Sequence, residues 1–259
     1  MPLSLPEFLT SGVFAFIIVF VRFGTAFMIM PGFGDSFVTT RIRLLMTLAF
    51  TFALFPVLVD RMPAQIPGTF GLIFLVVSEF IIGLFIGTMA RIFMAALDTA
   101  GMVISIQSGL GNAQLFNPLF AGQGSLMGAF LTITGVMLLF ATNLHHLLIM
   151  GVFESYEMFP VGAWADTGSM AELVARGVSA AFAVGVSIAA PFIIIGILIN
   201  AGMGVLSRLM PQIQVFMLAL PMQILITLAT VSMILGAAMM YWLGEYEEGM
   251  LYFFSTAQN

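Results

Sequence analysis

The sequence contains no cysteine and no lysine, and it has few charged residues of any kind. Without cysteine, the chain has no disulfide, no thiolate metal site and no thiol nucleophile. Its seven basic residues are therefore all arginines, which stay charged even when they are buried. The net charge is −5 and no basic residues cluster, which excludes a nucleic-acid-binding surface.

The residues that are present are strongly apolar. Hydrophobic residues make up 61% of the 259 residues, charged residues make up 7%, and the mean hydropathy is +1.14. Soluble domains have about 45–50% apolar and about 25% charged residues, so the sequence predicts an integral membrane protein. Long apolar runs without the alternation of barrel strands favour helices. The first residues lack the positive charge of a signal peptide, so we expect the first apolar run to remain.

Six apolar segments follow one another along the chain, and a helix needs about 20 residues to cross the hydrocarbon core. The most polar connection, residues 154–176, separates four segments from a final two-segment hairpin. The sequence therefore predicts an all-α membrane protein in two parts, 1–176 and 177–259. The expected segments are 12–30, 44–59, 70–97, 126–142, 178–199 and 213–243, and a continuation of the fourth segment to residue 152 is left open.

Residues 107–125 differ from everything around them. This stretch holds four glycines, one proline and five asparagine or glutamine residues between two apolar segments. Such residues do not continue a spanning helix, because lipid offers no partner to free backbone and amide groups. We interpret the stretch as a loop that lines a pore or cavity, although an ordinary loop outside the membrane explains the same composition. The apolar plug of this loop is expected to consist of Leu115, Phe116, Leu119 and Phe120.

Four charged residues fall within or beside the apolar segments, where a lone charge costs at least about 2.5 kcal/mol against lipid. Arg22 and Glu79 are expected to pair, and so are Arg91 and Asp98, which lie two turns apart on one helix face. Two roles are open: a polar path or proton relay, and structural pairing between the helices of an assembly. Pairing is favoured, because a guanidinium does not release its proton.

The remaining motifs carry less information. Gly83 and Gly87 form a GxxxG pair, which favours the close approach of another helix. His145 and His146 point roughly 100° apart on a helix, so we expect no metal site there. The 21 methionines either replace leucine as filler or line surfaces that repack against several partners. The sequence has no catalytic triad, no phosphate-binding loop and no paired carboxylates, so we expect neither an enzyme nor a cofactor.

Taken in order, several short motifs resemble the FliR family of flagellar export-gate proteins, which is called SctT in injectisomes. The most specific motif is Ser207-Arg208-x-x-Pro211-Gln212-x-x-Val215-Phe216. Gln214 departs from the asparagine that the family often has there. The other matching pieces are Arg22-Phe-Gly24, Pro31-Gly-Phe33, Arg41-x-Arg43, Glu79-x-x-x-Gly83-x-x-x-Gly87, Ala100-Gly101, Gln107, Gly111, Asn117-Pro118, His145-His146-Leu-Leu, Ser155, Pro160 and Pro191.

The resemblance implies a subunit of the type III export apparatus, in the bacterial inner membrane at the flagellar basal body. A FliP-like part, 1–176, would be joined to a FliQ-like hairpin, 177–259. The helices would form bent hairpins in a helical hetero-oligomer with FliP and FliQ, next to FlhB and FlhA, that passes unfolded export substrates. The implied pore plug contains Gly109, Leu110, Gly111, Leu115, Phe116, Asn117, Pro118, Leu119 and Phe120, and the implied FlhB-facing hairpin tip contains Ser207, Arg208, Pro211 and Gln212.

Two alternatives remain at this stage. A secondary transporter for a small solute would use Pro191 and Pro221 to break helices around a midplane site. That class requires an inverted repeat, which four segments followed by an unlike hairpin do not show. The injectisome homologue of the export gate is the second alternative.

Overall fold

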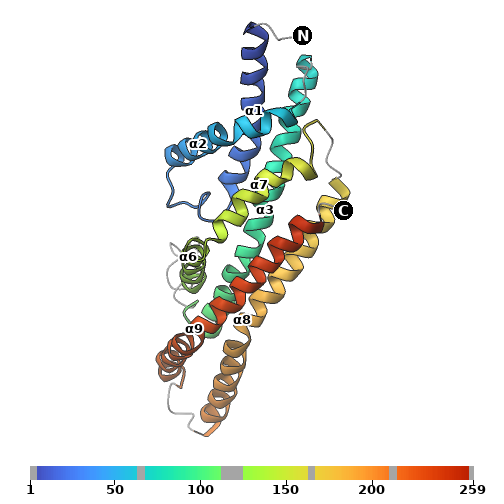
Figure 1. Cartoon of the computed structure of the whole chain (residues 1–259). Helices are drawn as coiled ribbons and strands as arrows, with labels where there is room; N and C mark the ends of the chain where they lie inside the picture. The colour runs from blue at the N-terminus through green and yellow to red at the C-terminus, as the bar shows by residue number, and fades with distance from the viewer. Residues whose placement is uncertain (1–4, 63–67, 112–124, 163–166, 210–214, 257–259) are drawn as a thin grey trace. The chain divides into compact units, whose positions relative to one another are not determined.

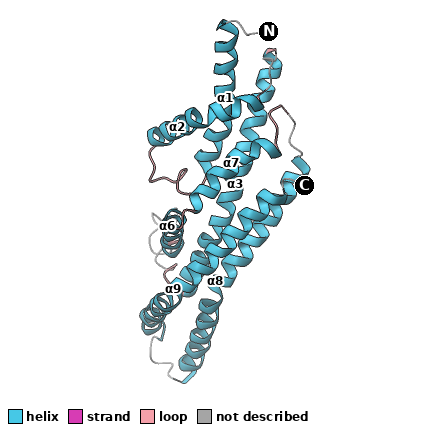
Figure 2. Cartoon of the chain, viewed as in Figure 1, coloured by secondary structure: helices cyan, strands magenta, loops and turns pink. Residues whose placement is uncertain are grey.

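The structure is a computed structural model that describes residues 5–62, 68–111, 125–162, 167–209 and 215–256. These residues are helical, with turns between the helices and no strand among them (Figure 2). The predicted all-α class is therefore confirmed. The helices are α1 (Leu5–Ile29), α2 (Thr40–Leu58), α3 (Thr69–Gln107), α6 (Leu126–Ala141), α7 (Leu144–Met158), α8 (Thr167–Leu209) and α9 (Val215–Thr256), with a short 3-10 helix at Val59–Arg61 (Figure 1).

Most of the helices are long and apolar enough to cross a membrane. Within the described ranges, α1, α2, α3, α8 and α9 meet this condition, which gives five candidate spans. The number rises to six if α6 and α7, which are separated by a short break, count as one broken span. The break falls at Asn143, whose φ of 61° is left-handed. Asparagine adopts this conformation more readily than most residues that carry a side chain.

Several helices are longer than the apolar segments that predict them. α3 continues past Asp98 and Gly101 to Gln107, and α8 continues through Asn200 to Leu209. The polar connection expected at 154–176 is also helical at both ends, because α7 ends at Met158 and α8 begins at Thr167. The predicted ends were wrong here because a single polar residue does not end a helix, and at Asp98 a neighbouring group also binds the side chain. The Thr132 hydroxyl donates to the Asp98 carboxylate at 2.7 Å.

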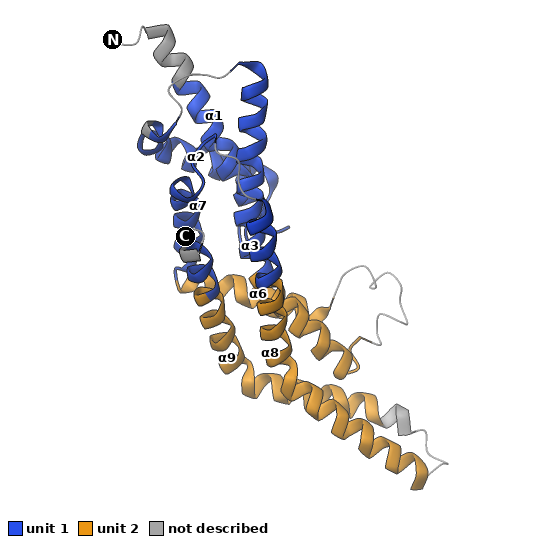
Figure 3. Cartoon of the chain, turned by 90° about the vertical axis from the view of Figure 1, so that its right-hand side faces the viewer, with its two compact units in different colours: residues 1–92, 143–177, 249–259 blue, residues 93–142, 178–248 orange. Residues whose placement is uncertain are grey.

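The helices pack into two compact units (Figure 3). Unit 1 contains Met1–Ile92, Asn143–Gly177 and Gly249–Asn259, and unit 2 contains Phe93–Thr142 and Val178–Glu248. Helices α3, α8 and α9 therefore contribute one end to each unit. This division follows packing, whereas the predicted parts 1–176 and 177–259 follow the order of the chain. The two-part organisation stays a prediction.

In unit 1, α1 and α3 lie side by side and run in the same direction. Gly83 of α3 faces Arg22 of α1, and Gly87 faces Ala26. Both contacts move four residues toward the C-terminus on each helix, so the two helices are parallel. A Cβ atom would lie 2.5 Å from the Arg22 carbonyl oxygen if added to Gly83, and 2.9 Å from the Ala26 carbonyl oxygen if added to Gly87. The GxxxG pair therefore brings α3 against the α1 backbone, as its spacing predicts.

In unit 2, α8 packs against α3 in the same manner. Gly185 faces the carbonyl oxygen of Ala96, where a Cβ atom would lie at 2.7 Å, and Gly196 faces the Gln107 side chain. These contacts again advance together along both helices, so α3 and α8 are parallel. Glycine at these positions lets the two backbones come closer than any side chain would permit.

Helix α6 crosses α3 at a glycine–glycine contact. A Cβ atom added to Gly101 would overlap the backbone of Gly128. About two turns away from this contact along α6, Trp242 of α9 is buried over Gly135 and donates a hydrogen bond from Nε1 to the Phe93 carbonyl oxygen at 3.1 Å. The core of unit 2 therefore depends on small residues where α6 meets α3 and on one large ring that covers Gly135.

Replacing Gly101 with alanine should destabilise the protein, because the new methyl group would push α6 away from α3. Overpacking of this kind costs about 1–3 kcal/mol, which thermal unfolding in detergent would detect. Gly236→Ala is the matched control, since nothing lies within 4 Å of the added Cβ position and alanine favours the helix. A G101A protein as stable as G236A would show that the two helices do not depend on this contact.

Candidate functional site

A buried ion pair joins α1 and α3 in unit 1. Arg22 and Glu79 are fully buried. The Arg22 Nε atom donates to Glu79 Oε2 at 2.6 Å, and Nη2 donates to Oε1 at 2.9 Å. A bidentate contact of this kind is the strongest form of arginine–carboxylate pairing. The pair expected from the sequence is therefore present.

The same guanidinium also binds the end of α7. Its Nη1 atom donates to the Ser155 hydroxyl at 3.1 Å, and Nη2 donates to the Phe159 carbonyl oxygen at 2.9 Å. Phe159 caps the C-terminus of α7, so the positive charge lies at the negative end of the helix dipole. The Tyr156 ring centroid lies 3.9 Å from the guanidinium carbon. A single arginine side chain thus holds three helices together.

Most hydrogen-bonding groups of this cluster bind one another, although the buried Tyr156 hydroxyl has no partner among the described residues. Arginine keeps its proton, Glu79 accepts on both of its oxygens, and the Ser155 hydroxyl donates to the Val152 carbonyl oxygen at 2.6 Å. A proton relay through this cluster would require Arg22 to release its proton, which a guanidinium does not do. The geometry favours a structural role over a proton relay, but the pair joins two helices of one chain and not helices of different protomers.

The second pair expected from the sequence is wrong. Arg91 Nη1 donates to Asp35 Oδ1, whereas Asp98 accepts a hydrogen bond from Thr132. Residues seven positions apart on a helix are separated by about 10.5 Å along its axis. Each side chain therefore binds a nearer group on a neighbouring segment.

Asp35 organises the turn between α1 and α2, and the sequence analysis missed it. Its Oδ2 atom accepts from the Gly32 N–H at 2.7 Å, and Gly32 has a φ of 81°. Arg43 donates to the Asp35 carbonyl oxygen at 2.7 Å. An aspartate in a glycine-containing turn is the usual signal for such side-chain-to-backbone bonds, and only that local signal could have identified it.

The predicted plug loop begins at the C-terminus of α3. The Gly109 N–H donates to the Ile106 carbonyl oxygen at 3.2 Å, and the Gly111 N–H reaches back to the Ser105 carbonyl oxygen at 3.0 Å. These bonds close the end of the helix, where carbonyl groups otherwise lack partners. Gly109 has a φ of 74°, which disfavours residues that carry a side chain. Leu110 lies half-buried between the two glycines.

Ser125 anchors the other end of the same loop. It is the N-cap of α6, where its hydroxyl accepts from the Gly128 N–H at 3.0 Å. The hydroxyl donates to the Gly101 carbonyl oxygen at 2.8 Å and accepts from the Ser105 hydroxyl at 2.6 Å. Both ends of the loop are therefore tied to α3. Six predicted plug residues lie outside the described part of the chain: Leu115, Phe116, Asn117, Pro118, Leu119 and Phe120.

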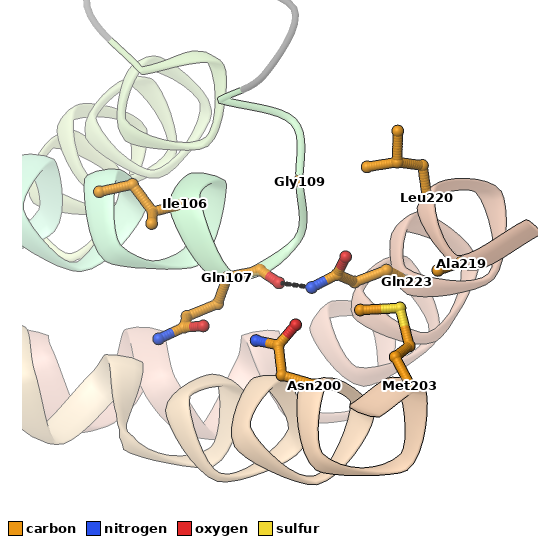
Figure 4. Close-up of a pocket in the computed structure, with 8 residues that line it drawn as sticks. All are labelled: Ile106, Gln107, Gly109, Asn200, Met203, Ala219, Leu220 and Gln223. Carbon is orange, nitrogen blue, oxygen red and sulfur yellow. Dashed lines mark hydrogen bonds between the residues drawn. The ribbon is translucent and has the colours of Figure 1, made fainter. Parts of the chain in front are cut away.

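A pocket of about 210 Å³ lies beside the start of this loop in unit 2 (Figure 4). Gln223 of α9 is only 7% exposed, and its Nε2 atom donates to the Gln107 carbonyl oxygen at 2.6 Å. Figure 4 shows the Asn200 side-chain amide pointing from α8 into the space near Gln107 and Gln223. The lining residues are Ile106, Gln107, Gly109, Asn200, Met203, Ala219, Leu220 and Gln223.

The pocket presents three carboxamides and no charged side chain. Carboxamides both donate and accept hydrogen bonds, so this surface suits an uncharged polar ligand. The sequence predicts Gln107 at the edge of the loop, whereas Asn200 and Gln223 were not predicted as members of a site. No local pattern links these two residues, because only the packing of α8 and α9 against α3 brings them together.

The two other predicted groups are only partly described. Ser207 and Arg208 are exposed in the last turn of α8, whereas Pro211 and Gln212 lie outside the described residues. The FlhB-facing role of this tip stays a prediction. In the described ranges, no three histidine, aspartate or glutamate side chains gather as ligands for a metal ion.

Replacing Glu79 with leucine should destabilise the protein by about 3–5 kcal/mol, because Arg22 would remain buried without its counter-charge. The double variant R22M/E79L should be more stable than E79L, since it removes both charges. The control is R61Q, which breaks the exposed Arg61–Glu157 pair and should cost less than about 1 kcal/mol. Unfolding in detergent measures all three, and equal effects of E79L and R61Q would contradict the assigned role.

Comparison with known proteins identifies relatives over most of the chain. Residues 13–249 match the family described as bacterial export proteins, family 1. The chain is 38% identical over 232 residues to the flagellar biosynthetic protein FliR of Caulobacter vibrioides, which covers 89% of this chain and 92% of that protein. It is 29% identical over 220 residues to FliR of Bacillus subtilis, covering 82% of this chain and 83% of that protein. The Yop proteins translocation protein T of Yersinia pestis is 32% identical over 156 residues, 60% of each chain.

The matched range contains the Arg22 cluster, both ends of the loop and the carboxamide pocket. The resemblance to the FliR family, expected from short motifs, is therefore confirmed over nearly the whole chain. This chain belongs to the bacterial export proteins, family 1, as a FliR-type member.

Proposed function

We propose that the chain is a core subunit of the flagellar type III protein-export gate, where it helps to form and plug the channel for unfolded flagellar proteins. The observation that carries this proposal is the extent of the similarity to FliR, with 38% identity over 89% of the chain. The similarity is not confined to one segment, so the role is transferred for the chain as a whole.

The proposed location is the bacterial inner membrane, at the flagellar basal body. The chain is a membrane-embedded member of a bacterial export family, with five helices long enough to span in the described part. Flagellar proteins are made in the cytoplasm, so a gate that passes them must lie in the first membrane they meet. The proposed membrane is therefore the inner membrane and not the outer membrane.

A hetero-oligomer with FliP and FliQ is the proposed assembly. Many large apolar side chains of the chain are exposed, including Phe52 at 76%, Phe70 at 91% and Met233 at 85%. Apolar surface of this extent requires lipid or protein to cover it. In the proposal, residues 1–176 correspond to a FliP-like part, residues 177–259 correspond to a FliQ-like hairpin, and neighbouring subunits cover part of this surface.

Residues 107–125 are the proposed pore plug. Two features of the described ends support this assignment: the serine bonds that tie Ser125 to α3, and the left-handed backbone at Gly109. The first fixes where the loop begins and ends, and the second turns the chain away from the helix axis. Leu115, Phe116, Leu119 and Phe120 then supply apolar bulk to fill the channel at rest.

The end of the FliQ-like hairpin is the proposed contact for FlhB, with FlhA in the same apparatus. Ser207 and Arg208 are exposed at the end of α8, which supports their availability to a partner. Pro211 and Gln212 complete the tip in the sequence motif. Arg208 is the basic residue in the last turn of α8, so a partner surface with acidic groups suits it best.

The alternatives carry less support. The similarity to the Yop translocation protein covers 60% of the chain, against 89% for FliR of Caulobacter vibrioides, which favours the flagellar role over the injectisome role. A small-solute transporter is disfavoured by the match to an export family over residues 13–249. An enzymatic role is not proposed, because a gate subunit guides its substrate without changing its covalent structure.

Deleting the gene for this chain should abolish motility and the secretion of flagellar proteins into the medium, and the wild-type gene should restore both. The assembled chain should also purify together with FliP and FliQ. A protein exported by another route is the control for general secretion. Normal flagellar secretion without the chain, or a stable chain that purifies alone, would contradict the proposed function.

Deleting residues 110–120 should raise ion leakage through the assembled complex, because the channel would lose its plug. Assembly with FliP and FliQ should persist, since Ser125 and the end of α3 are retained. Conductance measured in planar bilayers tests this, with G236A as the control for a change elsewhere in the chain. Unchanged conductance in an intact complex would rule out the plug assignment.

A further inference from the structure

The carboxamide pocket in unit 2 shares Gln107 and Gly109 with the start of the proposed plug loop, and its other lining residues belong to α3, α8 and α9. We propose that it binds a peptide group of the extended polypeptide that passes through the gate, by hydrogen bonds that do not depend on the substrate's sequence. This inference rests on the proposed export function and adds to it a site of contact with the substrate.

Gln223 is held in one orientation. It is 7% exposed, and one Nε2 hydrogen is committed to the Gln107 carbonyl oxygen at 2.6 Å. A primary amide has a second N–H and a carbonyl oxygen, and these groups keep a fixed direction while the first bond holds. Gln223 therefore acts as a positioned partner, which lowers the entropic cost of binding a ligand.

Gln107 and Asn200 are the other two carboxamides of the pocket. Their side chains make no hydrogen bond to any residue that the structure describes, and Asn200 points into the pocket (Figure 4). The Gln107 side chain lies against Gly196, which has no side chain to displace it. The Gln107 side chain is half-buried and the Asn200 side chain is exposed, so their amide groups are open to a ligand that bonds to them.

A peptide group fits this chemistry better than a charged ligand does. It carries one N–H and one carbonyl oxygen, the same groups that each carboxamide offers in return. No charged side chain lines the pocket, so a metal ion, a phosphate or a carboxylate would lose its hydration without a counter-charge. Since every residue has a backbone amide, recognition of this kind serves unfolded substrates of any sequence.

The size and the walls of the pocket agree with this occupant. Its volume of about 210 Å³ is well above the roughly 10–15 Å³ that a cavity needs to hold one water molecule. Ile106 and Leu220 supply apolar walls, and Met203 adds a flexible side chain that adapts to different shapes. One peptide group with a small or flexible side chain can therefore enter. Hydrogen bonds between uncharged groups are weaker than those of charged groups, so the peptide group can also leave.

The test uses the assembled gate in cells, with a flagellar substrate fused to a folded domain so that it stalls in the channel. A photocrosslinking residue replaces Ile106, which lines the pocket and is 66% exposed. The matched control carries the same residue in place of Met233, which is 85% exposed on α9 and does not line the pocket. The stalled substrate should crosslink at position 106 and not at position 233.

Asn200→Leu provides the sharper comparison, because it removes one amide without breaking any hydrogen bond between described residues. The crosslink at position 106 should fall about fivefold, the factor that corresponds to one ordinary hydrogen bond. Asn200→Gln keeps the amide and should retain most of the crosslink. Equal yields from N200L and N200Q would overturn the proposal.

Three other results would also overturn it. They are a crosslink from position 106 only to another gate subunit, a crosslink only to residues 112–124 of this chain, and equal substrate crosslinking from positions 106 and 233. If secretion requires the chain and any of these occurs, the pocket proposal fails while the export function stands. Secretion that persists without the chain would remove the export function and the pocket proposal together.

Discussion

Arg22 cannot remain buried without Glu79, and much of unit 1 follows from this requirement. A guanidinium keeps its charge under all conditions that a cell provides, so the fold must bring a carboxylate and further acceptors to it. Glu79 comes from α3, while Ser155 and the Phe159 carbonyl oxygen come from the end of α7. In a chain with 61% hydrophobic residues, apolar contacts do little to distinguish one helix register from another. The hydrogen bonds of a single charge do distinguish them, because a shift by one residue would leave that charge unpaired.

Glycine lets the helices approach closely enough for this register to form. Gly83 follows Glu79 by one turn of α3 and faces the Arg22 carbonyl oxygen, so the close helix approach and the ion pair belong to one contact. Unit 2 has the same close backbone contacts at glycine, but without an ion pair, at Gly185 and at the Gly101–Gly128 crossing. Both units therefore rely on backbone proximity, which suits apolar helices because lipid competes equally well for their larger side chains.

The sequence predicts the parts of the structure that depend on local pattern or on rare residues. Helices, the Arg22–Glu79 pair and the Gly83 contact could be predicted, because charges and spaced glycines stand out in apolar segments. The Arg91–Asp98 pairing was wrong because spacing on one helix was the only information, while Asp35 approaches Arg91 from a distant turn. Asn200 and Gln223 were missed for a related reason. Each is an ordinary amide in its own segment, and only long-range packing places both beside Gln107.

The Arg22 cluster and the carboxamide pocket differ in how many hydrogen-bonding groups they leave free for a ligand, and this difference bears on transport. The Arg22 cluster is buried and its charged groups bind one another, so it stabilises helices and offers little to a passing molecule. The carboxamides of unit 2 keep donors and acceptors that the described residues do not use. An extended polypeptide lacks internal hydrogen bonds, so each of its amides needs a partner while water is excluded. A charged side chain would bind substrates of opposite charge too tightly and would repel substrates of like charge. A carboxamide forms the same hydrogen bonds with the backbone of every substrate. Transport of many sequences through one channel therefore favours carboxamides at the surfaces that the substrate touches.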